Sequence, residues 1–160
     1  MQKSEASRDA HAVALREIEA LLAAHADVAE TDLERGDGYV RIALRPRVAN
    51  ACPLDLVLFD DGAVDLRLAE EEHEGVRDIP PARLATLIGA VLAGKVKTIR
   101  ETTLATGQLR SVEVVVRPDR GEAWRRRREV EPISRLVAPE AAEREAHHYV
   151  AYRREDAPRP

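Results

Sequence analysis

The most apolar helical stretch of this chain, against which the other elements are expected to pack, is Pro80-Pro-Ala-Arg-Leu-Ala-Thr-Leu-Ile-Gly-Ala-Val-Leu-Ala-Gly94. Its large apolar side chains recur at the three- and four-residue spacing of a helix and are Leu84, Leu87, Ile88, Val91 and Leu92. The two prolines suit the first helical positions, where a missing N–H costs nothing, and Gly94 suits the left-handed residue that ends a helix. Burying the five side chains would contribute about 8–15 kcal/mol before entropy is counted. The sequence therefore predicts that this helix anchors the core.

The same helix has a second face of small side chains, formed by Ala82, Ala85, Gly89 and Ala93. Arg83 is the only charged residue between Pro80 and Gly94, whereas a helix with one buried face is usually polar on the other. Small side chains let another backbone approach closely, so we expect this face to be covered too. Two occupants remain open: the N-terminal helix of the same chain, or a second copy of the chain in a homodimer.

Composition indicates one soluble domain with its own core, because the 160 residues are 44% hydrophobic and 34% charged. Aromatic residues make up only 3%, so the core must consist of Leu, Val, Ile and Ala, and few side chains are suited to stacking on bases or sugars. The single cysteine, Cys52, excludes a disulfide framework within the chain and fits a reducing compartment. Neither an apolar signal region nor a membrane-length apolar run is visible, and we expect a cytoplasmic protein.

Charge is divided unevenly along the chain, whose net charge is −4. Residues 1–94 contain 10 basic and 18 acidic residues, a net of −8, and residues 95–160 contain 15 and 11, a net of +4. Such asymmetry concerns partners and solubility rather than fold. It permits head-to-tail association or an anionic partner at the C-terminal end, and also a mixed surface with neither.

The N-terminal third reads as a helix followed by strands. After a frayed polar lead, an amphipathic helix is expected from about Asp9 to His25, with Ser7 as its N-cap. Alternation of apolar and acidic residues from Ala29 predicts a weak edge strand. The segment 39–45 predicts a clean strand, with Val40, Ile42 and Leu44 facing inward.

The register of the first hairpin, over residues 54–68, follows from its pattern. A three-residue loop, Asp60-Asp61-Gly62, places Leu58 opposite Val64 and keeps one apolar face together. A two-residue loop would move the apolar set to the wrong face, so it is disfavoured. Residues 69–79 read as an acidic loop.

A second hairpin is expected over Val96–Pro118, with a two-residue turn at Thr106-Gly107. This turn sets Arg100 opposite Glu113 and Ile99 opposite Val114, which pairs charges and apolar side chains.

Residues 119–160 form a charged C-terminal arm in this interpretation, in which a short strand over residues 121–132 is left open. Its candidate binding residues for an anionic partner are Trp124, Arg125, Arg126, Arg127 and Arg128. In one alternative the arginines bind phosphates while the Trp124 indole stacks on a base. In the other, the arm packs Trp124 onto the domain or onto a partner. A last helix is expected from Pro139 to Tyr152, and disorder from Arg153 to the end.

No catalytic, cofactor-binding or metal-binding residues are predicted. The histidines do not show the converging spacing of zinc ligands, and nothing places a base beside Cys52. Asp60 and Asp61 are explained by turn chemistry. Glycine-rich phosphate loops and nucleophile-elbow serines are missing from the sequence.

We therefore expect an α+β fold: an antiparallel sheet of about five or six strands with helices on one face, in the order α-β-β-β-β-α-β-β. Residues 1–118 would form the domain. This element order is similar to that of type III secretion chaperones, small acidic homodimers that bind proteins, although no motif is shared. The working hypothesis is a non-enzymatic protein-binding homodimer of chaperone, immunity or adaptor type. The alternative is a nucleic-acid-associated protein that uses the Trp124–Arg128 arm.

Overall fold

The computed structural model describes residues 2–130 and 141–153. The elements in these residues are α1 (Gln2–Ala24), β1 (Ala29–Gly36), β2 (Tyr39–Pro46), β3 (Leu54–Phe59), β4 (Val64–Leu68), β5 (Glu71–Val76), α2 (Pro81–Leu92), β6 (Val96–Thr103), β7 (Leu109–Val116), β8 (Trp124–Glu129) and β9 (Ala142–His148). The α+β class and the predicted order, from helix to strands to helix to strands, are confirmed.

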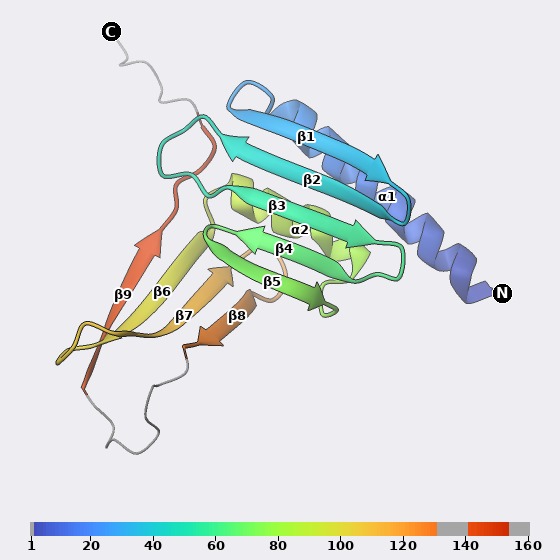
Figure 1. Cartoon of the computed structure of the whole chain (residues 1–160). Coiled ribbons are helices and arrows are strands. Elements are labelled where there is room, and N and C mark those ends of the chain that lie inside the picture. Colours follow the sequence, from blue (N-terminus) through green and yellow to red (C-terminus); the bar gives the residue numbers. More distant parts are fainter. Residues whose placement is uncertain (1, 131–140, 154–160) are drawn as a thin grey trace, which may run out of the picture.

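The described strands form two antiparallel sheets rather than one (Figure 1). Five strands are ordered β1-β2-β3-β4-β5, and four are ordered β8-β7-β6-β9. The second sheet exists because β8 and β9 add one strand to each side of the β6–β7 hairpin. Its far end projects away from the five-stranded sheet (Figure 1).

Both helices cover the same face of the five-stranded sheet, with α1 behind β1 and β2 and α2 behind β3 and β4 (Figure 1). The five large side chains predicted for α2 are all buried, and Ile88 is completely inaccessible. The register of the β3–β4 hairpin is confirmed, because Leu58 pairs with Val64 and Leu56 with Leu66. Gly62 takes the left-handed conformation (φ 85°) that the three-residue loop requires.

The chain returns to this core after β9. Val150 forms a parallel bridge with Ala51, and the Tyr152 N–H donates to the Leu92 carbonyl oxygen at 2.9 Å. The Tyr152 side chain is buried, and its hydroxyl donates to the Cys52 carbonyl oxygen. Gly94 allows this return, because it has a φ of 72° and an added Cβ would lie 2.4 Å from the Ala151 nitrogen.

Three predictions about the type or the bounds of an element are wrong. Helix α1 begins at Gln2, so Ser7 lies inside it and is not its N-cap. The presumed acidic loop contains β5, in which Glu71 and Val76 are buried. The expected last helix is the strand β9, which pairs along its length with β6; residues 139–140 lie outside the described residues, as do 154–160 of the predicted disordered tail.

The register of the second hairpin differs by one residue from the prediction. Thr98 pairs with Val114 and Ile99 with Glu113, with an irregularity after Glu101. This register places Val114 and Val116 on the core side together with Val96. Burial of the valines therefore sets the register, and the expected cross-strand charge pairs do not.

Candidate functional site

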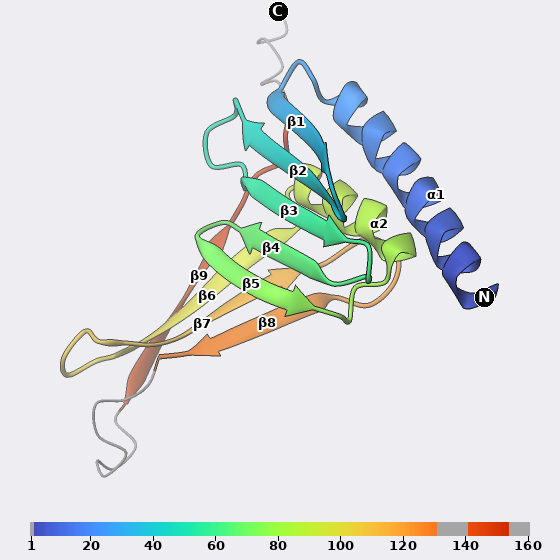
Figure 2. The same cartoon turned by 45° about the vertical axis from the view of Figure 1, so that its right-hand side comes forward.

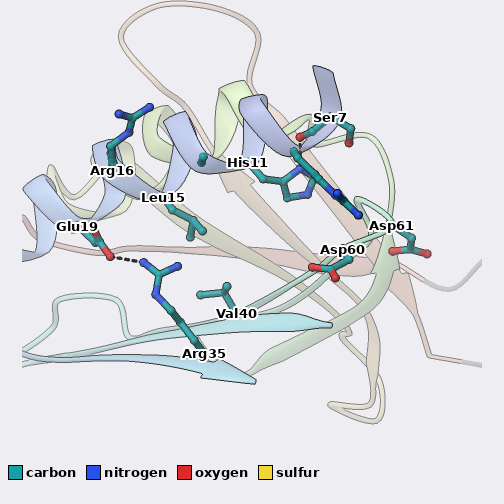
Figure 3. A pocket seen from close by; sticks show the side chains of 11 residues that line it. Ser7, His11, Leu15, Arg16, Glu19, Arg35, Val40, Asp60 and Asp61 are labelled. Atoms are coloured by element: carbon teal, nitrogen blue, oxygen red, sulfur yellow. Dashed lines mark hydrogen bonds and ion pairs between the residues drawn. The ribbon is translucent and has the colours of Figure 1, made fainter. Parts of the chain in front are cut away.

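A cleft opens between the sheet and the part of α1 that runs from Ser7 to Glu19. The C-terminal half of this helix is held against the core by Leu15, Ile18 and Leu22, whereas its first turns extend beyond the end of the sheet (Figure 2). The space between them has a volume of about 1030 Å³. Its lining residues are Ser7, Arg8, His11, Ala12, Leu15, Arg16 and Glu19 from α1, and Arg35, Val40, Asp60 and Asp61 from the sheet (Figure 3).

An ion pair closes one end of the cleft. The Arg35 guanidinium, at the end of β1, donates to Glu19 Oε1 of α1 at 2.5 Å (Figure 3). Both side chains are about half exposed, so the pair contributes little to stability. Its consequence is geometric, because it ties the helix to the sheet where the two elements begin to separate.

The turn between β3 and β4 bounds the opposite end. Asp61 accepts the Ala63 N–H at 2.9 Å and an Arg77 guanidinium hydrogen at 2.7 Å, and these bonds lower the pKa of its carboxyl. Asp60 has no ion-pair partner among the described residues. Its carboxylate lies across the cleft from α1 (Figure 3).

The histidine of the cleft is fixed by the helix itself. His11 Nδ1 donates to the Ser7 carbonyl oxygen at 2.7 Å, which leaves Nε2 as the ring nitrogen without a bond to the helix. That nitrogen is buried and has no hydrogen-bond partner among the described residues.

The lining of the cleft is balanced in charge. Three arginines and three carboxylates surround a floor formed by Ala12, Leu15 and Val40. Such a lining favours no ligand of a single charge sign. It matches a polypeptide segment, which brings apolar side chains and both kinds of charge together.

The predicted Trp124–Arg128 arm is strand β8, and its arginines bind carboxylates of the same chain. The nearest N–O distances are 3.6 Å for Arg125–Glu113, 2.7 Å for Arg126–Asp78, 3.1 Å for Arg127–Glu129 and 2.8 Å for Arg128–Glu71. Trp124 is only 7% exposed and meets the His73 ring edge-on, with centroids 5.4 Å apart. The alternating side chains Trp124, Arg126 and Arg128 thus join β8 to β5 and to the segment that follows it.

The Arg128–Glu71 pair is a bidentate contact. Arg128 donates from Nε and Nη2 to the two oxygens of Glu71, at 2.8 and 3.0 Å. The Glu71 side chain is 10% exposed, and the bidentate contact lowers the pKa of its carboxyl.

The small-residue face of α2 is divided by the structure. Ala85 is buried, and α1 packs against α2. Ala82 and Ala93 are exposed, and a Cβ added at Gly89 would meet no atom within 4 Å. Both proposed occupants of this face, helix α1 and a second copy of the chain, therefore stay predictions.

Groups suited to covalent or metal chemistry do not converge in the described residues. Cys52 is completely buried, and burial raises the pKa of its thiol to about 12. Within residues 2–130 and 141–153, no three His, Cys, Asp or Glu side chains are placed to hold a metal ion. Over the same residues, neither helix is long and apolar enough to cross a membrane.

The chain matches no protein-family model, no curated protein and no solved structure. These comparisons therefore assign no function to the chain.

The cleft itself was not predicted from the sequence, because it depends on the angle between α1 and the sheet. The available signal was the polar flank of α1, where Arg8, Arg16 and Glu19 lie beside an apolar stripe.

Proposed function

We propose that the protein is a non-enzymatic protein-binding module that holds a segment of a partner polypeptide in the cleft beneath α1. The observation that carries this proposal is the lining of the cleft, which combines an apolar floor with equal numbers of arginines and carboxylates. Protein-binding sites typically combine an apolar centre with a polar rim in this way.

The dimensions of the cleft support a short occupant. From Ser7 to Glu19 a helix rises about 18 Å, at about 1.5 Å per residue. An extended segment of about five residues covers that length, at about 3.3 Å per residue. We expect the segment to place an apolar side chain against Leu15 and Val40. A basic side chain of the same segment would then reach the unpaired carboxylate of Asp60.

Nucleic-acid association through the Trp124–Arg128 arm has less support. Each of the four arginines already has a carboxylate within 4 Å, and Trp124 is buried. Binding a phosphate backbone there would first require these pairs to open.

The proposal is tested by selecting short peptides on the full chain from a displayed random library. Selected peptides are then titrated by calorimetry into Ala12→Arg and Val13→Arg variants. Ala12 is exposed and lines the cleft, whereas Val13 is 46% exposed and is absent from the lining. The two variants introduce the same side chain at neighbouring exposed positions of one helix, so they add the same charge to the same element.

We expect Ala12→Arg to weaken peptide binding by about ten-fold or more, which corresponds to about 1.4 kcal/mol. Val13→Arg should bind as the wild type does. Selected peptides should share an apolar residue near a lysine or arginine. Failure to enrich any peptide, or equal binding by both variants, would contradict the proposal.

A further inference from the structure

Four basic side chains gather at one end of the four-stranded sheet. Lys97 of β6 pairs with Val115 of β7 on one side and with His148 of β9 on the other. The Arg117 N–H donates to the Lys95 carbonyl oxygen at 2.9 Å, which continues the β6–β7 ladder by one pair. Side chains two residues apart share a face, so Lys95, Lys97, Arg117 and His148 all lie on the same side of the sheet.

This side is the outer face of the sheet. Val114 and Val116 belong to the hydrophobic core, whereas Val115 between them does not. Val115 is nevertheless buried, and it lines the same pocket as the basic side chains. The basic groups therefore surround a small apolar floor.

A pocket of about 230 Å³ lies at this place, and its lining is positively charged. The lining residues are Gly94, Lys95, Val96, Lys97, Val115, Arg117 and His148. The lining contains no carboxylate, and none of its basic side chains forms an ion pair with a described residue. Like charges directly opposite each other on two strands destabilise a sheet. Lys95 and Arg117 are such a pair. A bound anion would remove that repulsion.

We infer that this pocket binds a single phosphate group, either as inorganic phosphate or as the phosphomonoester of a small molecule. Two ammonium groups and a guanidinium supply charge-assisted hydrogen bonds, and the guanidinium fork matches two oxygens of a phosphate. The volume is below the range of about 300–1,000 Å³ that holds whole drug-sized ligands. It suits one compact anionic group.

The surroundings of the pocket limit the ligand to one phosphate. Further along the same face, Arg125 pairs with Glu113, and Arg127 lies near both Glu101 and Glu129. A nucleic-acid backbone that continued from the pocket would meet these carboxylates. The lining also contains no phenylalanine, tyrosine or tryptophan on which a base could stack. The site is separate from the cleft beneath α1 and does not depend on the function proposed for it.

The inference is tested by titrating the full chain with inorganic phosphate, with glycerol phosphate and with a short DNA duplex. Binding is followed by calorimetry and by backbone amide shifts. Arg117→Gln removes one cation from the pocket. Arg47→Gln is the matched control, because Arg47 is also exposed, has no ion-pair partner among the described residues and lies outside the pocket lining.

We expect saturable phosphate binding that Arg117→Gln weakens by about ten-fold or more and Arg47→Gln leaves unchanged. The amide shifts should centre on Lys95, Lys97 and His148. Tighter binding of glycerol phosphate would identify a phosphomonoester as the ligand, and equal or tighter binding of inorganic phosphate would identify the free anion. Equal loss in both variants, shifts elsewhere, or no binding at millimolar phosphate would overturn the inference. Preference for the DNA duplex would overturn the restriction to one phosphate.

Discussion

Gly89 within α2 and Gly94 just after its C-terminal end should respond in opposite directions to the same substitution. Gly89 has an ordinary helical conformation, and an added Cβ would meet no atom within 4 Å. Gly89→Ala should therefore stabilise the fold by about 0.5–1 kcal/mol, because alanine loses less backbone entropy in a helix. Gly94 has a φ of 72°, and an added Cβ would lie 2.4 Å from the Ala151 nitrogen.

The cost at Gly94 has two sources. Left-handed backbone strain in an alanine is worth about 1–2 kcal/mol. The backbone of Ala151 cannot yield as a flexible side chain would, so the returning segment must shift. This shift disturbs the hydrogen bond from Tyr152 to the Cys52 carbonyl oxygen, and leaving a buried acceptor unpaired costs about a further 1–3 kcal/mol. Gly94→Ala should therefore destabilise the fold by about 2–5 kcal/mol.

Urea unfolding of the two variants and the wild type measures both effects. The slope of free energy against urea should stay unchanged, so that midpoints report stability. Destabilisation by Gly94→Ala of less than about 1 kcal/mol would refute the close approach at Ala151 and the strain argued from φ. Destabilisation by Gly89→Ala would contradict the open space found around Gly89 within a single chain.

Three further predictions concern the core, the seam between the sheets and self-association. Ile88→Ala should cost about 2–5 kcal/mol in urea unfolding, because Ile88 is completely buried; a loss below about 1 kcal/mol would show that this face is not core. The bond from Arg128 lowers the pKa of Glu71 below its ordinary value of 4.5, so the ionised carboxylate stabilises the folded state. This stabilisation is complete above pH 4.5 and is lost as the pH falls through the lowered pKa. Glu71→Gln should therefore flatten the stability profile below pH 4.5, and an unchanged profile would mean that the pair contributes nothing. Light scattering should show that the wild type is a dimer and that Gly89→Glu separates it into monomers. Ala23→Glu, on the exposed side of α1, should leave the dimer intact. A mass near 17.8 kDa for the wild type at tens of micromolar would contradict this prediction.

The parts of the fold that local patterns determine were predictable. Helix α2 was recognised from its apolar spacing and from the prolines and glycine at its ends. The β3–β4 register followed because only one loop length keeps Leu56 and Leu58 with their apolar partners. In both cases the deciding interactions join residues close in sequence, so the sequence alone contains the information.

Strand β9 was not predictable because its own sequence favours a helix. Alanine, glutamate and arginine are strong helix formers, and the side chains of β9 are nearly all exposed. What makes it a strand is the row of backbone hydrogen bonds offered by β6, whose paired residues lie 39 to 51 positions earlier in the chain. An edge strand of this kind has no buried face and hence no apolar alternation to reveal it.

The candidate sites escaped prediction for a related reason. The cleft requires α1 to diverge from the sheet, and that angle depends on packing between distant elements. The phosphate pocket requires Lys97 and His148 to be neighbours, which only the β6–β9 pairing achieves. Neither residue stands out in the sequence, because a lone lysine and a lone histidine are ordinary surface residues.

The uneven charge along the chain has a structural explanation in the seam between the two sheets. The acidic segment around β5 contributes Glu71 and Asp78, and the basic strand β8 contributes Arg128 and Arg126 as their partners. When only the charges of β8 itself are counted, the strand resembles a binding site for anions. When the carboxylates paired with its arginines are counted too, the charges balance. The positive charge that remains after this pairing includes the β6–β7–β9 end of the second sheet, where no carboxylate lines the pocket. A search for anion binding should therefore begin at that end rather than at the arginine run.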